Sequence, residues 1–285
     1  MLQPMRDLLQ RAKAGRYAVG SFDVPNLETA HGVLSAAHEL RSPVILAIPE
    51  SFFTLTGFEP LVQAISFMAN QLPIPVATLL DHGKSRDSVV RAIRAGMTSV
   101  MFDGSALPED ENTRLTREIV DIAHAVGVSV EGEIGVVGRG AVYHERPELV
   151  QQGLTDPRDA LVFVEATGVD ALAVAVGTIH GHYTSEPTIH YDLLDRIASA
   201  TGLPLVLHGG SSTGDHRLAK STAHGVCKVN IYTDMSTAAM KRLEDIFATG
   251  HHHEMRANDL LGEVKLAFQK TAAHYIHVFG SAGQA

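Results

Sequence analysis

Eight short apolar runs recur along the chain, and their spacing is the feature that most restricts the fold. The runs begin 23 to 43 residues apart, enough for a strand, a helix and two loops in each repeat. The segments between them carry helical patterns, and this alternation predicts parallel strands covered by helices. We expect strands at residues 17–22, 43–48, 75–80, 99–103, 128–133, 171–176, 204–208 and 227–231.

Helix boundary signals agree with this alternation. In residues 155–168, Thr155 or Asp156 can cap a helix, Pro157 suits its first turn and Gly168 can end it. Residues 85–96 and 111–127 repeat this organisation and also end in glycine. Eight strand–helix units favour a single (β/α)8 (TIM) barrel domain over residues 1–285. A doubly wound open sheet is the alternative, although no GxGxxG sequence follows the first strand.

Two segments depart from the regular repeat. Residues 133–154 fill the longest gap between strands and contain glycines, charges and a proline, so we expect a long loop that could act as a lid. Residues 233–250 and 259–280 have helical patterns and follow the last strand, which predicts a C-terminal helical extension.

Composition excludes several classes of protein. The net charge is −9 and is spread without long blocks, so we expect no nucleic-acid partner. Cys227 is the single cysteine, which rules out an intramolecular disulfide and suits a reducing compartment. Residues 1–15 predict a short amphipathic helix and not a signal peptide, and no segment is long and apolar enough to span a membrane. These features predict a soluble cytoplasmic protein.

Three histidines each lie just beyond an apolar run. They are His82, His180 and His208, after the third, sixth and seventh predicted strands. A lone histidine is usually structural, but the carboxyl ends of barrel strands meet on one face, so these three are expected to converge. Three imidazoles with an open coordination position form a typical catalytic zinc site. Asp81 precedes His82 and is expected to be an acid/base group beside the metal, its alternative role being a helix cap.

Further polar residues are expected at the same face of the barrel. Asp103 ends the fourth strand, and Glu131 and Glu133 share one face of the fifth, where they could orient ligands or form an alternate metal position. Residues 208–212 (HGGSS) and 230–234 (NIYTD) predict a phosphate-binding site made by backbone N–H groups, the alternative being an ordinary glycine-rich turn.

Other basic residues fit a catalytic role less well. His182 forms an HxH pair with His180 but falls beyond the strand end, and residues 251–253 (HHH) are more typical of a solvated loop. Lys228 could in principle form a Schiff base, but no dry pocket to lower its pKa is evident and the metal cluster makes it unnecessary.

Together these motifs resemble the class II, metal-dependent ketose-bisphosphate aldolases over essentially the whole chain, and are most similar to the tagatose-bisphosphate aldolase branch. The motifs are SPVILA at 42–47, LLDHG at 79–83, SVMFDGS at 99–105, VEGEIG at 130–135, LAVAVGTIHGHY at 172–183, PLVLHGGSS at 204–212 and KVNIYTD at 228–234.

The resemblance implies a reaction and a site. The reaction is reversible aldol cleavage of a phosphorylated ketose to dihydroxyacetone phosphate and an aldehyde. The resemblance also implies one zinc ion per subunit on the three histidines, Asp81 as proton donor and acceptor, and a homodimer or homotetramer. Some members of the family also need a monovalent cation. The implied contacts to dihydroxyacetone phosphate are Gly181, Gly209, Gly210, Ser211, Asn230, Ile231, Tyr232 and Thr233.

Four positions depart from the family pattern. Asp23 stands in place of the asparagine that usually follows Phe22, Gly83 in place of a second histidine, and Tyr232 in place of a small or acidic residue. The lid lacks the usual glutamate after a double glycine, and Glu145, with His144 or Tyr143 as alternatives, is the candidate to replace it. These changes leave the metal and phosphate chemistry intact but affect the sugar end of the substrate.

The sequence is compatible with other functions. Within the family, the substrate could be another 1-phosphorylated sugar or sugar acid. A zinc hydrolase on the same barrel is disfavoured, because such enzymes usually place an HxH pair on the first strand and none is present there. A non-catalytic aldolase-like subunit is disfavoured by the intact Asp81 and by the three histidines.

Overall fold

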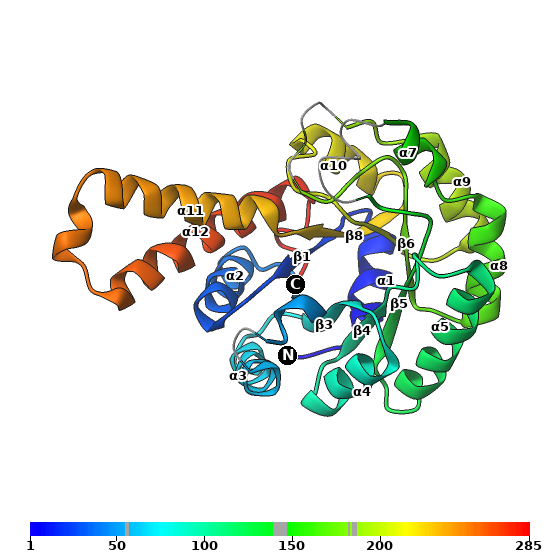
Figure 1. Ribbon diagram of the computed structural model, residues 1–285, viewed down its shortest axis with the longest axis horizontal. Coiled ribbons are helices and arrows are strands. Elements are labelled where there is room, and N and C mark those ends of the chain that lie inside the picture. The colour runs from blue at the N-terminus through cyan, green and yellow to red at the C-terminus, as the bar shows by residue number, and fades with distance from the viewer. Residues whose placement is uncertain (55–56, 139–146, 182, 184–186) are drawn as a thin grey trace.

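The computed structural model describes residues 1–54, 57–138, 147–181, 183 and 187–285, and its centre is a closed barrel of parallel strands (Figure 1). The strands pair in chain order from β1 to β8, and β8 pairs with β1. This closure confirms the (β/α)8 prediction and excludes an open sheet. The strands are β1 (Val19–Asp23), β2 (Val44–Pro49), β3 (Val76–Gly83), β4 (Ser99–Phe102), β5 (Ser129–Ile134), β6 (Ala171–Val174), β7 (Leu205–Leu207) and β8 (Val226–Ile231).

Helices surround the barrel, and one closes its amino-terminal end. Met5, Leu8 and Leu9 of the first helix are buried in one apolar cluster with Val19 and Ile45 from the strands. The helices are α1 (Met5–Gly15), α2 (Leu27–Glu39), α3 (Phe58–Asn70), α4 (Arg86–Ala95), α5 (Glu109–His124), α7 (Pro147–Gln152), α8 (Pro157–Thr167), α9 (Tyr191–Thr201), α10 (Asp215–Thr222), α11 (Thr233–Ala248) and α12 (Ala257–Val278), with short 3-10 turns η1 (Glu50–Phe52) and η2 (His251–Glu254).

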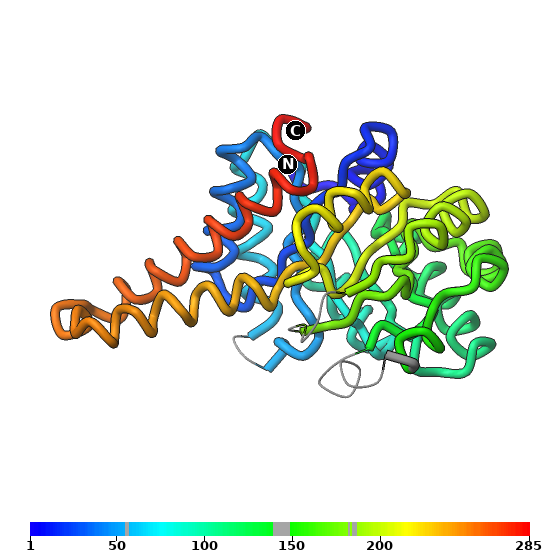
Figure 2. The backbone as a smooth tube through the Cα atoms, turned by 90° about the horizontal axis from the view of Figure 1, so that it is seen from above, coloured from blue at the N-terminus to red at the C-terminus, as the bar shows by residue number. Residues whose placement is uncertain are grey.

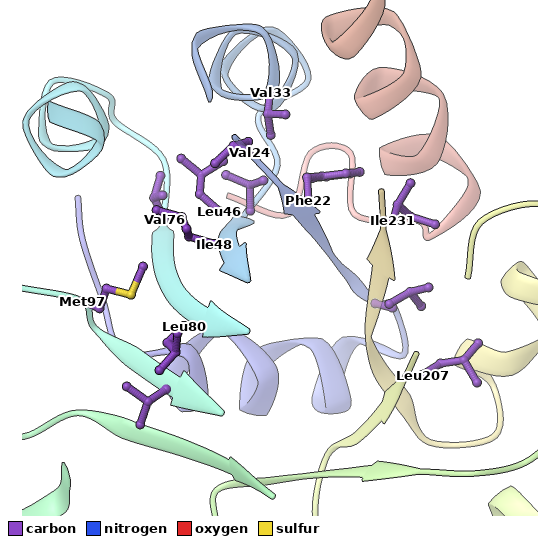
Figure 3. Packing of buried hydrophobic residues seen from close by; sticks show 14 of the residues in the cluster. Phe22, Val24, Val33, Leu46, Ile48, Val76, Leu80, Met97, Leu207 and Ile231 are labelled. Carbon is purple, nitrogen blue, oxygen red and sulfur yellow. The ribbon is translucent and has the colours of Figure 1, made fainter. Parts of the chain in front are cut away.

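Most of the apolar core lies between the strands and the helices (Figure 3). Phe22, Leu46 and Ile231 point outward from their strands into this layer, and each is at most 1% exposed. Because side chains of a strand alternate between its two faces, this arrangement leaves the neighbouring residues to face the barrel interior. The alternation therefore decides which polar residues can reach the site.

The predicted helix ends are confirmed where the sequence signals are strong. Helix α8 begins at Pro157, its Asp156 cap accepts hydrogen bonds from two backbone N–H groups, and Gly168 ends it in the left-handed conformation. Helix α4 is likewise capped by Ser85 and ended by Gly96.

The expected loop over residues 133–154 is partly wrong. Helix α7 forms one and a half turns within it, over Pro147–Gln152, and β5 extends to Ile134. The segment PELVQQ has proline at its first position and a short apolar face, signals that are too brief to predict a helix from sequence. The expected lid candidates Tyr143, His144 and Glu145 lie outside the described residues.

The C-terminal extension is confirmed as a hairpin of two helices. Figure 2 shows α11 and α12 side by side, with their distal half projecting away from the barrel and η2 at the tip. Residues 251–253 form part of the 3-10 turn η2 at this tip and not the expected loop, and the side chains of His251 and His253 are exposed. Four large apolar side chains of the hairpin are more than 40% exposed: Met240, Phe247, Leu261 and Leu266. Among the described residues, no helix combines the length and apolar character needed to cross a bilayer.

Candidate active site

The three predicted histidines come together at the carboxyl end of the barrel. The ring centres of His82 and His208 are 4.7 Å apart, and His180 lies 5.1 Å from His82 and 5.7 Å from His208. Each ring offers a nitrogen atom, and these atoms all lie within 4.8 Å of one another. The three rings therefore have the spacing of a site that a divalent ion could complete.

Each histidine reaches the site from a different kind of segment. His82 belongs to the last residues of β3, where the pairing with β4 is irregular between Leu80 and Gly83. Its φ of +47° is rare for a residue with a side chain, and such bulges re-aim side chains near active sites. His208 directly follows β7. His180 is not at a strand end as expected, because β6 already ends at Val174.

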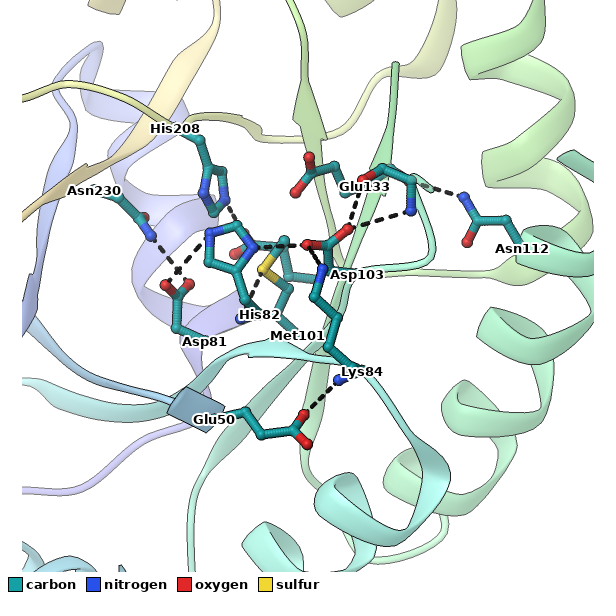
Figure 4. A network of polar contacts seen from close by, with 12 residues as sticks. Glu50, Asp81, His82, Lys84, Met101, Asp103, Asn112, Glu133, His208 and Asn230 are labelled. Atoms are coloured by element: carbon teal, nitrogen blue, oxygen red, sulfur yellow. Dashed lines mark hydrogen bonds and ion pairs between the residues drawn. The ribbon is translucent and has the colours of Figure 1, made fainter. Parts of the chain in front are cut away.

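One group of contacts, which we call the outer set, holds His82 at the rim (Figure 4). The His82 Nδ1 lies 2.8 Å from Asp103 Oδ2, and Lys84 forms an ion pair with the same oxygen. Ser105 donates its hydroxyl to the other oxygen of Asp103 at 2.6 Å. Asp103 therefore orients His82, and His82 Nε2 is left facing the site, 3.8 Å from Asp81 Oδ2.

A second group, the inner set, holds His208 inside the barrel. His208 Nε2 lies 3.0 Å from Glu131 Oε1. The Lys228 Nζ lies 3.0 and 2.8 Å from the two carboxylate oxygens of Glu131. All three side chains have no exposed surface. His208 Nδ1 is buried and has no hydrogen-bond partner among the described residues, so it is the atom left to bind a metal.

The two histidines have opposite protonation tendencies. Burial opposes protonation of His82, but Asp81, the hydrogen bond to Asp103 and nearby Glu133 outweigh it and raise its pKa to about 9. For His208, burial together with positive His82 and Lys228 lowers the pKa well below its usual value. A surplus of carboxylates around His82 favours a proton and would favour a divalent cation for the same electrostatic reason.

Asp81 lies beside the histidines and is 1% exposed. Asn230 donates its amide to Asp81 Oδ1 at 3.0 Å, which fixes the plane of the carboxylate. Burial disfavours the charged form, yet the neighbouring His82, Lys228 and His208 keep the pKa of Asp81 below its ordinary value. The group is therefore an ionised carboxylate with one oxygen facing the histidine cluster.

Glu133, unlike Asp81, lies in surroundings that disfavour its charged form. Burial and the negative charge of Asp103 raise its pKa to about 8, and its Oε2 has no hydrogen-bond partner among the described residues. Together with His82 and Asp103, it forms a second group of possible ligand atoms within 4.8 Å of one another. The donor sets around His82 thus fit a divalent metal.

The predicted phosphate-binding loop lies next to the histidines. Gly209 has a φ of +70°, and a Cβ atom there would lie 2.3 Å from the carbonyl oxygen of Ile179, so only glycine fits. The Ser211 hydroxyl accepts hydrogen bonds from the N–H groups of Tyr232 and Asp234, at the amino terminus of α11. This places the loop against a helix end with donors suited to an anion.

Two further contacts brace this loop from outside the barrel. Asp234 accepts hydrogen bonds from the N–H and the hydroxyl of Ser212, at 2.7 and 2.6 Å. Tyr275 on α12 donates its hydroxyl to the same carboxylate. The C-terminal hairpin is therefore connected to the expected phosphate site, a link that sequence analysis did not predict, because Tyr275 is 41 residues from its partner.

A cavity of about 1220 Å³ joins these parts. Most of the residues predicted to bind substrate line it, but Gly210 and Ile231 do not. The side chain of Ile231 packs in the outer core, so any contact with substrate would come from its backbone. The predicted site residues on the cavity wall are Asp81, His82, Asp103, Glu133, His180, Gly181, Gly209, Ser211, Asn230, Tyr232 and Thr233.

The wall of the cavity at the ends of β1 and β2 is acidic and aromatic. It includes Asp23, Glu50 and Phe52, and Phe52 packs edge-on against Tyr232 with ring centres 5.5 Å apart. Glu50 also accepts a hydrogen bond from the N–H of Lys84 at 2.6 Å. Two of the four departures noted in the sequence, Asp23 and Tyr232, thus meet on this wall.

A third departure, Gly83, has a steric cause. A Cβ atom at Gly83 would lie 2.6 Å from the carbonyl oxygen of Met101 and 2.9 Å from a methyl group of Leu80. A histidine at this position would require the bulge in β3 to shift. The backbone conformation that directs His82 into the site therefore requires a glycine at position 83.

Comparison with known proteins decides the family. The model of the class II fructose-bisphosphate aldolases matches residues 3–284. The chain belongs to this family. It is 39% identical to the uncharacterized protein YdjI of Escherichia coli K12, and 37% identical to the fructose-bisphosphate aldolase of Geobacillus stearothermophilus. These matches cover the whole chain, with 100% of YdjI and 99% of the Geobacillus enzyme.

A solved structure extends the similarity to three dimensions. The crystal structure of the YdjI aldolase superposes with a TM-score of 0.88 at 37% identity, covering 100% of both chains. Members of this aldolase family are metal-dependent lyases that act on phosphorylated sugars. Membership therefore establishes the reaction class of this chain, an aldolase, and disfavours the hydrolase and the non-catalytic subunit.

Proposed function

We propose that this aldolase uses zinc, held by His82, His180 and His208, to cleave a phosphorylated ketose reversibly into dihydroxyacetone phosphate and an aldehyde. The observation that carries the proposal is the convergence of the three rings beside Asp81, with ligand atoms within 4.8 Å of one another. The orphaned His208 Nδ1 and the surrounding carboxylates support a divalent ion there. Three nitrogen donors suit zinc.

His82, His180 and His208 would hold the ion, which would supply Lewis-acid chemistry to polarise the ketone and to stabilise the negative charge left by cleavage of the C3–C4 bond. Asp81 accepts the proton of the C4 hydroxyl as that hydroxyl becomes the aldehyde, and it returns the proton in the condensation direction. Its ionised state and its hydrogen bond to Asn230 prepare it for this role. We propose Glu145, in the segment of the chain between β5 and α7, as the group that protonates C3.

The loop after β7 and the amino terminus of α11 are proposed to bind the C1 phosphate. Backbone N–H groups of Gly181, of residues 209–211 and of Thr233 would supply the hydrogen bonds. Binding energy from the phosphate then positions the reacting carbons next to Asp81. Fixed backbone geometry at Gly209 supports this assignment.

A second candidate substrate is a ketose that carries phosphate at C1 only. Relatives named fructose-bisphosphate aldolase support a bisphosphate. The acidic wall formed by Asp23 and Glu50 favours the alternative, because carboxylates repel a second phosphate. Fructose 1,6-bisphosphate, tagatose 1,6-bisphosphate and the matching 1-phosphates are therefore the substrates to compare.

The direct test is a coupled assay for dihydroxyacetone phosphate, with each of these substrates and purified protein. Asp81→Ala is expected to lower turnover about 10²–10⁴-fold while zinc content is retained. Asp121→Ala, on the exposed surface of α5, is the matched control and keeps full activity. Normal turnover in Asp81→Ala would refute the assignment of the base.

We also propose that the protein is a cytoplasmic homodimer or homotetramer that assembles through the C-terminal hairpin. The exposed Met240, Phe247, Leu261 and Leu266 are large apolar groups on a segment that projects from the barrel. Burying such groups against a second copy would stabilise the hairpin. Sedimentation measurements on the wild type and on Phe247→Asp would show whether the hairpin holds the oligomer together.

A further inference from the structure

A buried ion pair in the barrel interior has no part in the mechanism above. Lys228 and Glu131 have no exposed surface, and both carboxylate oxygens lie within 3.0 Å of the Lys228 Nζ. Removing two charges from water is costly, and an apolar pair of similar size is often at least as stabilising. A buried ion pair is therefore weak evidence for a purely stabilising role.

A bulge in β8 brings Lys228 into the interior. Leu205 pairs with Val226, but the next residue of β7, Val206, pairs with Lys228, so Cys227 is an extra residue on β8. Cys227 lies in the inner apolar cluster, and Lys228 also reaches across the interior to Glu131. In a regular strand the two side chains would point to opposite faces. The bulge turns both inward.

Glu131 connects this lysine to a proposed metal ligand. Its Oε1 accepts hydrogen bonds from both Lys228 Nζ and His208 Nε2, each at 3.0 Å. With Nε2 donating to Glu131, the ring presents Nδ1 to the other histidines. Nδ1 is the buried atom that has no hydrogen-bond partner among the described residues. Carboxylates that orient ligating histidines in this way commonly tune metal affinity.

Glu131 is also close enough to bind a metal itself. Ligand atoms of Asp81, Glu131 and His208 lie within 4.8 Å of one another and form a competing donor set. Because the ammonium group of Lys228 occupies both oxygens of Glu131, this carboxylate remains an acceptor for His208. We propose that Lys228 is a positioning residue that acts through Glu131, fixing His208 as a metal ligand and keeping Glu131 out of the ligand set. This inference rests on the proposed three-histidine site.

The first test replaces the ammonium group with an uncharged chain of similar length. Lys228→Met is expected to weaken zinc binding about 10–100-fold, measured by competition with a chromophoric chelator. The visible spectrum of the cobalt-substituted protein should also change, since Glu131 becomes free to coordinate. Cys227→Ala, the neighbouring residue on the same bulge, is the matched control and should leave zinc affinity and the cobalt spectrum unchanged.

A double variant keeps the test valid if Lys228→Met does not fold. Glu131→Gln with Lys228→Met removes both charges together, so no unpaired charge is left buried. Its zinc affinity should match that of Glu131→Gln alone, because a residue that acts through Glu131 has no further effect once that carboxylate is gone. Additive losses would overturn the proposal, as would zinc affinity and a cobalt spectrum equal to wild type in the foldable variants.

The same measurements separate this inference from the function on which it rests. If the wild type binds no zinc, or if His208→Ala binds it as tightly as the wild type, the three-histidine site itself is wrong. If the wild type binds zinc through His208 but Lys228→Met binds it equally well, only the role of Lys228 is refuted.

Discussion

The outer and the inner set of contacts repeat one chemical arrangement in two different environments. In each set a lysine pairs with a carboxylate that in turn contacts a proposed metal-binding histidine. The lysine side chain of the outer set, Lys84, is 56% exposed, whereas that of the inner set, Lys228, has no exposed surface. Water can screen the contact of Lys84 with Asp103, but it cannot reach the contact of Lys228 with Glu131.

This difference in environment separates the histidines. Neighbouring carboxylates outweigh burial and raise the pKa of His82 to about 9, whereas burial lowers the pKa of His208. Similar contacts can therefore support two different histidines. His82, at the mouth of the barrel, can take up a proton near neutral pH, whereas His208, in the barrel interior, stays neutral.

Stability should respond most strongly to the inner lysine. Lys228→Met leaves the Glu131 carboxylate buried without a counter-charge, so we expect a loss of about 3–5 kcal/mol in the free energy of unfolding. Lys84→Met removes a largely exposed partner and should cost about 0–1 kcal/mol. Urea denaturation of the metal-free protein measures both. Equal losses in the two variants would contradict the contrast.

Metal affinity tests the carboxylate of the outer set. Asp103→Asn keeps the shape of the side chain but weakens its hydrogen bond to His82 Nδ1. Zinc affinity should therefore fall about 10–100-fold. Lys84→Met should cause a smaller loss, one that disappears at high salt because the group is exposed. If the loss of zinc affinity in Lys84→Met did not depend on salt, the contact between Lys84 and Asp103 would not be screened as proposed.

Protonation of His82 makes the stability of the metal-free protein depend on pH. The pKa of His82 is about 9 in the folded state and 6.5 in the unfolded state, so protonation stabilises the fold fully at pH values below 6.5. This stabilisation is lost as pH rises through about 9. Thermal unfolding temperatures should therefore fall between pH 6.5 and 9, and His82→Gln should flatten this trend. An NMR titration in which His208 also takes up a proton near neutrality would contradict the assignment.

The smallest effect on function is expected from the contact between Tyr275 and Asp234, which involves no lysine. Tyr275→Phe removes the hydroxyl that supports Asp234 behind the phosphate loop. We expect KM for the phosphorylated substrate to rise several-fold, roughly the effect of one hydrogen bond, with little change in kcat. Tyr191→Phe, which removes a hydroxyl that donates to the backbone carbonyl of Arg217 on α10 and makes no contact with Asp234, is the control. A drop in kcat alone would place Tyr275 in another role.

Sequence predicts most of this architecture because its signals are local. Apolar runs, caps such as Asp156 and terminal glycines such as Gly168 each act within a few residues, and the barrel brings their ends together. The convergence of His82 and His208 follows from that geometry.

The missed contacts depend on distant or irregular backbone. The sequence around Lys228 predicts no dry pocket, yet this side chain is fully buried, because a bulge turns it toward a carboxylate 97 residues away. No local sequence pattern predicts such a bulge. The brace from Tyr275 and the short helix α7 were missed for related reasons, since long-range pairing and tertiary packing decide them.

The most direct test of the account is the metal dependence of aldol cleavage. One zinc ion should bind per chain, chelator-stripped protein should release no dihydroxyacetone phosphate from a phosphorylated ketose, and added zinc should restore the reaction. His208→Ala should lose both the zinc and the activity. Cleavage at an undiminished rate by the stripped protein would contradict the account.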